Sequence, residues 1–343
     1  MKPLTQVSPR VRANTGFRVP IGTFLAAVLT ICGPWFHTFA QGQSAPLRRM
    51  RLDMVFSTSL FRAANRNDAI AAVRIWASMI GHAHGFQVDS TVEAVDDMAE
   101  IRRRVLAGSV GVLALDAVEY FELADLTAVE PVFCAMKGEG SVPPRYLVLV
   151  GANSGISSLE GLRGKTTIIH ANTGANLGQV WLDAMLYDAR LGRPEHFFRS
   201  VETVPKASSA ILPVFFGKAD AAIVDEGSFD VAREMNPQVG AKLRVLSASP
   251  PLVEGLFCIC RKQIAFLEEF LESVRDLHLD TQGKQILMVF GFSRLAPVDK
   301  PALEPVRELW RKHNLLYSQP PGKAPLASLS RKAAPPAGRG EDP

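Results

Sequence analysis

The chain has 343 residues, with 38 Lys and Arg against 34 Asp and Glu, which gives a net charge of +4. Four of the basic residues and none of the acidic ones lie in residues 1–40, so the remainder carries 34 of each. This balance excludes the strongly basic surface that is typical of nucleic-acid-binding proteins. The length is sufficient for two lobes of ordinary size.

The first 40 residues have the three parts of a secretory signal peptide. A basic segment comes first, an apolar run covers residues 21–32, and small residues at Thr38 and Ala40 form a cleavage site. A membrane anchor is the alternative, but the apolar run is too short to span a bilayer comfortably. We therefore expect cleavage after Ala40 and a periplasmic mature protein.

Residues 52–115 alternate between strands and helices. The sequence predicts strands over 52–56, 86–92 and 110–115 and helices over 69–80 and 98–106. This order is typical of a mostly parallel sheet covered by helices, where ligands bind at the carboxyl ends of the strands. Two segments follow such ends: Ser57, Thr58 and Ser59, and residues 116–120. A turn that only caps the next helix is the alternative for the serines.

A short strand, a polar turn and a helix occur together over residues 166–184. The β-branched run over 166–169 predicts a buried strand, and Leu177 and Trp181 begin an amphipathic helix. Between them lie Asn172, Thr173 and Gly174, residue types that favour a helix N-cap and a tight turn. A helix N-terminus directs backbone N–H groups at a bound anion, although an ordinary strand-to-helix turn has the same pattern.

The remaining body continues the α/β pattern. The sequence predicts strands over 131–135, 146–150, 197–204, 221–224, 243–246 and 256–260, and helices over 208–216, 264–280, 282–289 and 302–314. Asp225 ends the strand over 221–224. Residues 318–343 are rich in Pro, Ala, Gly and Ser, and we expect them to be a disordered tail.

The order of these elements and four short motifs resemble one protein family. The motifs are residues 157–165 (SSLEGLRGK), the turn over 172–174 (NTG), residues 217–225 (GKADAAIVD) and residues 290–298 (FGFSRLAPV). Over residues 52–314 the chain is similar to the phosphonate-binding (phosphate/phosphite/phosphonate) family of periplasmic solute-binding proteins, which serve ABC importers.

The resemblance implies an α/β, two-lobed periplasmic-binding-protein fold of type II. Each lobe is a mostly parallel sheet flanked by helices, with a ligand cleft between the lobes. The expected divisions are residues 41–147 and 254–317 for lobe 1 and residues 148–253 for lobe 2. The ligand contacts implied by the family are Tyr120, Asn172, Thr173, Gly174, Lys206, Ser208 and Asp225.

We expect the protein to capture a small oxyanion or zwitterion, phosphonate-like, for an ABC permease in the inner membrane, as a monomer without cofactor, metal or nucleic acid. An ionised Asp225 would repel an anion, so its expected partner is a protonated oxygen or an ammonium group on the ligand. The alternative for Asp225 is a helix cap. Two other functions stay open: a sensing subunit that signals to a membrane partner such as a sensor kinase, and an enzyme that uses the same cleft. No catalytic motif favours an enzyme.

Two further groups of side chains have structural interpretations. Arg102, Arg103 and Arg104 give one helix a basic face, interpreted as solvated rather than as a phosphate site. Cys134 would have to pair across neighbouring strands with one of two cysteines on a later strand, Cys258 or Cys260. Buried free thiols are the favoured alternative to such a disulfide.

Overall fold

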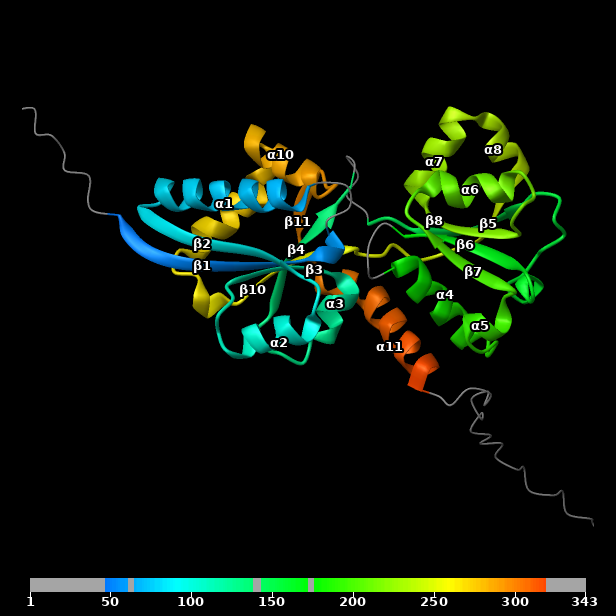
Figure 1. The fold of residues 1–343 in the computed structure, drawn as a ribbon, viewed down its shortest axis with the longest axis horizontal. Helices are drawn as coiled ribbons and strands as arrows, with labels where there is room; N and C mark the ends of the chain where they lie inside the picture. Colours follow the sequence, from blue (N-terminus) through cyan, green and yellow to red (C-terminus); the bar gives the residue numbers. More distant parts are fainter. Residues whose placement is uncertain (1–46, 61–64, 138–142, 172–175, 319–343) are drawn as a thin grey trace, which may run out of the picture. The chain divides into compact units, whose positions relative to one another are not determined.

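The structure is a computed structural model that describes residues 47–60, 65–137, 143–171 and 176–318. The expected signal peptide, the turn at Asn172, Thr173 and Gly174, and residues 319–343 of the expected tail lie outside this part. The described strands form two separate sheets, each with helices on both faces (Figure 1). This arrangement confirms the α/β fold expected from the sequence.

The first sheet has six strands in the order β11-β4-β10-β3-β1-β2. Strand β1 pairs in parallel with β2 and β3, as the strand–helix alternation predicts, whereas β10 is antiparallel to both β3 and β4, and β11 is antiparallel to β4. The sheet is therefore mixed rather than mostly parallel as expected, because β10 and β11 join it late in the chain in the antiparallel direction. The strands are β1 (Arg48–Ser57), β2 (Phe86–Val95), β3 (Val112–Asp116), β4 (Glu130–Met136), β10 (Gly255–Ile259) and β11 (Arg294–Pro297).

Helices cover both faces of this sheet, and the alternation of side chains along β3 shows how. Val112 packs into the core under α1, α9 and α10, whereas Leu113 packs into the core under α2 and α3 (Figure 1). The helices are α1 (Arg66–Ala83), α2 (Met98–Leu106), α3 (Ala117–Glu122), α9 (Leu267–Arg275) and α10 (Thr281–Val289). The last helix, α11 (Glu304–Ser318), packs mainly against α4 (Leu177–Asp188) and also against α3.

The second sheet has five strands in the order β7-β6-β8-β5-β9. Strand β6 is parallel to β7 and β8, and β5 is antiparallel to β8 and β9. Helices α6, α7 and α8 cover one face, and α4 and α5 cover the other (Figure 1). The elements are β5 (Tyr146–Gly151), β6 (Thr166–His170), α4 (Leu177–Asp188), α5 (Pro194–Phe197), β7 (Ser200–Val204), α6 (Ala207–Phe215), β8 (Ala221–Asp225), α7 (Glu226–Met235), α8 (Pro237–Lys242) and β9 (Leu243–Ala248).

Several elements differ from the sequence prediction, which also did not include α3, α5 and β11. The strand expected over 197–204 begins only at Ser200, because Pro194 starts the short helix α5, whose last residue, Phe197, is buried. The helix expected over 264–280 is restricted to α9 and a 3-10 turn. Helices α7 and α8 were not predicted, because their sequences are polar and each buries only one large side chain.

The three cysteines of the described part are buried and free, so the possible disulfide is not formed. In the strand pairing, Cys134 lies opposite Leu256, while Cys258 lies opposite Pro131. Burial raises the pKa of Cys258 well above its usual value and that of Cys260 to about 11. These thiols therefore stay protonated and serve as small apolar core residues.

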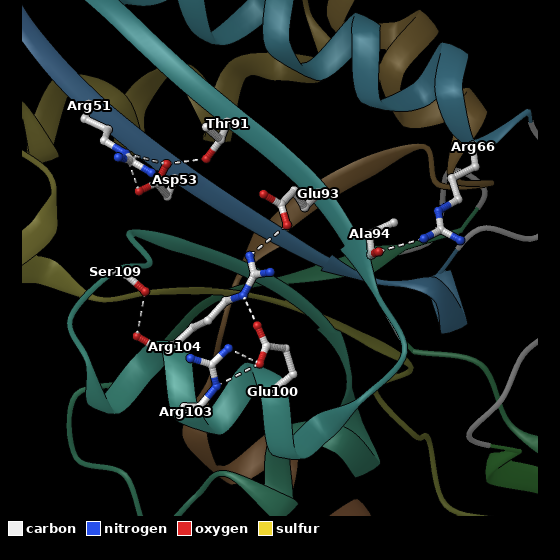
Figure 2. A network of polar contacts seen from close by, with 10 residues as sticks. All are labelled: Arg51, Asp53, Arg66, Thr91, Glu93, Ala94, Glu100, Arg103, Arg104 and Ser109. Carbon is white, nitrogen blue, oxygen red and sulfur yellow. Dashed lines mark hydrogen bonds and ion pairs between the residues drawn. The ribbon is translucent and has the colours of Figure 1, made fainter.

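The basic face of α2 is neutralised by carboxylates (Figure 2). The side chain of Arg104 pairs with Glu100 at 2.7 Å and with a glutamate of β2 at 2.8 Å, and Arg103 also contacts Glu100. Arg102 pairs with Asp125 at 2.7 Å. These guanidinium groups already have anionic partners on the protein, which agrees with a structural rather than a phosphate-binding role.

Candidate ligand-binding site

A hollow of about 490 Å³ lies where α6 and α7 begin. Its polar lining comes from Ser208 in the first turn of α6, from Asp225 and Ser228 at the start of α7, and from Lys137, which follows β4. Gly291, which follows α10, completes this part of the wall. The hollow therefore combines a cation, a carboxylate and two hydroxyl groups, and it contains two of the residues expected from the sequence.

Asp225 connects the buried strand β8 to α7. It is the N-cap of the helix: its carboxylate accepts hydrogen bonds from the Ser228 backbone N–H at 2.9 Å and from the Ser228 hydroxyl at 2.7 Å. Asp is a favoured N-cap because its short side chain reaches these otherwise unpaired N–H groups. Asp225 therefore caps α7, and the same side chain also lines the hollow, so its role as a ligand contact stays a prediction.

His170 supports the same carboxylate from the neighbouring strand. Strands β6 and β8 run in parallel, and both end at this edge of the sheet. The His170 ring is buried, with Nδ1 3.3 Å from the Asp225 carboxylate. Burial alone would raise the pKa of Asp225, but the hydrogen bonds from His170 and Ser228 outweigh it and hold the pKa well below its usual value. Asp225 is therefore an ionised acceptor at neutral pH.

The N-terminus of α6 offers donors to the hollow. Lys206 is the N-cap, but its side chain makes no capping hydrogen bond. A lysine has no acceptor atom, so the Lys206 side chain cannot cap the first N–H groups of the helix. Ser208 follows in the first turn and is exposed. The helix dipole, the N–H groups and the Ser208 hydroxyl all favour a negative ligand group here.

Lys137 brings positive charge to the hollow and is held by a buried partner. Its ammonium group forms an ion pair with the carboxylate of Glu254, which also accepts a 2.7 Å hydrogen bond from the Tyr146 hydroxyl. An ammonium group has three donors, so the ion pair leaves donors for a ligand. The positive charge of Lys137 also lowers the pKa of Asp225.

The three hydroxyl residues at the end of β1 contact carboxylates of the protein. The hydroxyls of Ser57 and Ser59 both contact the Glu119 carboxylate, the latter at 3.0 Å, and they lie 2.9 Å from each other. Thr58 donates to Asp96. Because these hydroxyl groups contact carboxylates of the protein, they are not directed at an anionic ligand. A role for the three residues in ligand binding stays a prediction.

The segment after β3 forms the short helix α3, with Asp116 as its N-cap. Asp116 and Glu119 form a capping box, and burial together with the nearby Glu119 charge raises the pKa of Asp116 well above its usual value. Tyr120 is half-buried against Phe121, with ring centroids 5.2 Å apart. Tyr120 does not line the hollow, and its role as a ligand contact also stays a prediction.

Sequence reasoning missed four residues of this site. Lys137 and Glu254 lie outside the predicted strands, and nothing local indicates that they pair. His170 ends a buried strand two residues before the expected anion site at Asn172. This position at the carboxyl end of a strand is the sequence feature that could have identified it. Ser228 belongs to α7, which was not predicted. The expected residues Asn172, Thr173 and Gly174 lie outside the described part.

Two features are absent from the described part of the chain. Within the described ranges, no three His, Cys, Asp or Glu side chains gather as ligands of a metal ion would. Among the helices described here, none is both long and apolar enough to cross a bilayer.

Comparisons with solved structures support the fold. A protein of Xanthomonas citri bound to ATP superposes with a TM-score of 0.57 at 13% identity, over 78% of this chain and 98% of that one. PhnD1 from Prochlorococcus marinus in complex with methylphosphonate gives 0.51 at 13% identity, over 77% and 98%. A binding-protein component of a phosphonate ABC transporter from Pseudomonas aeruginosa gives 0.50 at 14% identity, over 78% and 88%.

No curated protein matches the sequence. A family model does match it: "ABC transporter, phosphonate, periplasmic substrate-binding protein" covers residues 63–303, well over half of the chain. The two helix-flanked sheets agree with the type II fold expected from the resemblance. The chain therefore belongs to the family of periplasmic substrate-binding proteins of phosphonate ABC transporters.

Proposed function

We propose that the protein captures a small phosphonate-like oxyanion or zwitterion in the hollow at the start of α6 and α7. The observation that supports this most directly is the presence of Lys137, Ser208 and an ionised Asp225 in one hollow, in a chain of this family. The ammonium, the hydroxyl and the helix N-terminus suit an anion, and the carboxylate suits a proton donor on the same ligand.

This mixed charge pattern selects among anions. A fully ionised sulfate has no proton to offer Asp225 and would be repelled by it. A hydrogen phosphonate can donate through its O–H group, and an aminoalkylphosphonate through its ammonium group. We therefore expect these two classes to bind more tightly than sulfate.

The cellular setting follows from family membership together with the amino-terminal sequence. We infer that residues 1–40 are removed, that the mature monomer works in the periplasm, and that it presents its ligand to an ABC permease of the inner membrane. Amino-terminal sequencing of the mature protein is expected to begin at Gln41. We further infer that the protein binds its ligand without turnover, so that bound ligand is recovered chemically unchanged.

Titration calorimetry on the mature protein tests the proposed site. Methylphosphonate, an aminoalkylphosphonate and sulfate are titrated into wild type and into Ser208→Ala and Lys137→Gln. Hydrogen bonds to charged groups contribute about 1.5–3 kcal/mol, so each variant should bind phosphonates roughly tenfold more weakly or worse. Matched controls are Ser209→Ala on the next residue of α6 and Lys284→Gln on the exposed side of α10, neither of which lines the hollow.

The controls should bind like wild type, and melting temperatures identify any variant that is merely misfolded. Two results would contradict the proposed site. One is a lack of phosphonate binding by folded wild type. The other is an equal loss of affinity in the substituted and the control variants.

A further inference from the structure

One wall of the same hollow is apolar, and two of its side chains are exposed. Beyond the polar end, its lining comes from Ile211 of α6 and from Val231, Ala232 and Met235 of α7. Val231 is 54% exposed and Met235 is 82% exposed. The hollow therefore has an amphipathic lining, because it combines these exposed apolar side chains with an ionised carboxylate and a lysine. An inorganic ion would make no use of the apolar part.

The apolar side chains form a strip that leads away from the charged end. On α7, Gly227, Val231 and Met235 are spaced four residues apart and therefore follow one face of the helix. At 1.5 Å per residue, Val231 lies roughly 6 Å and Met235 roughly 12 Å along the helix from Gly227. Helix α6 contributes Ile211 at the same spacing from Ala207. The polar groups thus lie at one end of the hollow and the apolar groups at the other.

We infer, on the basis of the proposed function, that the ligand is an organophosphonate with a hydrocarbon substituent that lies along this strip. The charged head group occupies the end with Lys137, Ser208 and Asp225, and the substituent reaches at least as far as Val231. Inorganic phosphate and methylphosphonate fill only the polar end. The strip therefore determines specificity by contact with the part of the ligand that the charged groups do not touch.

The energetics distinguish this ligand class from smaller anions. Burial of one methylene group is worth about 0.8 kcal/mol, which corresponds to about a fourfold gain in affinity. Because the strip is open on one side, each methylene loses only part of its contact with water, and we expect about a twofold gain for each carbon added. Five additional carbons then strengthen binding by at least about tenfold.

The test is a chain-length series of methyl-, butyl- and hexylphosphonate, titrated calorimetrically into the mature protein. Wild type should bind hexylphosphonate at least tenfold more tightly than methylphosphonate. Val231→Thr and Met235→Ser should reduce this ratio to about threefold or less without weakening methylphosphonate. Both side chains are exposed, so folding should be unaffected, which melting curves check. The matched control is Met288→Ser on α10, which is 74% exposed and does not line the hollow.

The outcomes separate this inference from the proposed function. Equal binding of methyl- and hexylphosphonate would overturn the inference and leave the proposed function intact. A chain-length gain that survives in Val231→Thr and Met235→Ser would place the substituent elsewhere and would also overturn it. If folded wild type binds none of the three phosphonates, the proposed function fails and the inference fails with it.

Discussion

At the scale of single residues, Asp225 has two roles that can be separated. Its carboxylate caps α7 through Ser228 and contacts the buried ring of His170, and it lines the hollow. Capping needs only an acceptor oxygen, which Asn also provides. Ligand discrimination, as proposed, needs the negative charge. Two substitutions at this position therefore test different properties.

Asp225→Asn should keep the cap and lose the charge. We expect a change in unfolding free energy of less than about 1 kcal/mol from the cap itself, because Asn and Asp cap equally well. Binding of hydrogen phosphonates should weaken roughly tenfold, and sulfate should bind better. Asp225→Ala removes the cap as well and should cost about 1 kcal/mol more in stability. If Asp225→Asn binds its phosphonate with wild-type affinity in calorimetry, Asp225 is only a cap.

The depressed pKa of Asp225 predicts a dependence of stability on pH. The folded-state pKa lies below the unfolded value of about 3.9, so Asp225 contributes stability above pH 3.9 that is lost as the pH falls further. Wild type should therefore be more stable than Asp225→Asn at pH 5, and the difference should shrink towards pH 2.5. Urea unfolding at several pH values measures it. A difference that does not change with pH would show that the native contacts do not favour the ionised form.

The family resemblance, rather than local pattern, implied Ser208 and Asp225 as ligand contacts. Both line the hollow, and their role in binding stays a prediction. Lys137, His170 and Glu254 were not found, because their importance depends on pairing between segments far apart in the chain. Long-range pairing of this kind leaves no periodic signal in one sequence.

At the scale of elements, the position of α10 depends on Gly283, which packs directly against the backbone of the preceding turn. Its N-cap Asp280 accepts a 2.8 Å hydrogen bond from the Gly283 backbone N–H. A Cβ atom on Gly283 would lie 1.9 Å from the backbone carbonyl oxygen of Leu277. Because a backbone atom cannot rotate away as a side chain can, α10 or the preceding turn would have to move.

Gly283→Ala should therefore destabilise the protein even though Ala is the better helix former. Overpacking of this kind costs about 1–3 kcal/mol. Gln282→Ala, one residue earlier and exposed, should change stability by less than about 0.5 kcal/mol. Thermal and urea unfolding of the two variants gives the comparison. Equal stability of both variants would mean that the turn before α10 adapts freely.

The elements that were predicted well are those with a strong apolar pattern. The strand over 166–169 and the helix that includes Leu177 and Trp181 were expected and are present as β6 and α4. Helix α7 was missed because Phe229 is its only buried residue, and its stability depends on tertiary contact and on its Asp225 cap. Propensity and periodicity cannot identify such a helix.

At the scale of the whole molecule, two crossing segments connect the sheets. The chain leaves the first sheet after β4 for β5 and returns after β9 to β10. The two segments are joined by hydrogen bonds between Tyr146 and Ser249 at 2.8 Å and by the contacts of Glu254 with Lys137 and Tyr146. We propose that the sheets form two lobes, divided near residues 147–148 and 253–254.

Lys137 belongs both to this crossing region and to the hollow, so ligand binding should be coupled to lobe closure. Closure of two domains needs changes at only a few hinge residues. Small-angle scattering of the mature protein should show a smaller radius of gyration at saturating ligand. An unchanged profile at saturation, confirmed by calorimetry on the same sample, would argue for a rigid protein.

The most direct test of the account is the identity of the solute that the protein carries from the cell. The protein is purified gently, without added ligand, and native mass spectrometry is combined with phosphorus detection on the released solute. We predict a one-to-one complex with a phosphorus-containing organic anion, which a Lys137→Gln and Ser208→Ala double variant fails to retain. A bound solute without phosphorus, or equal retention by the double variant, would contradict it.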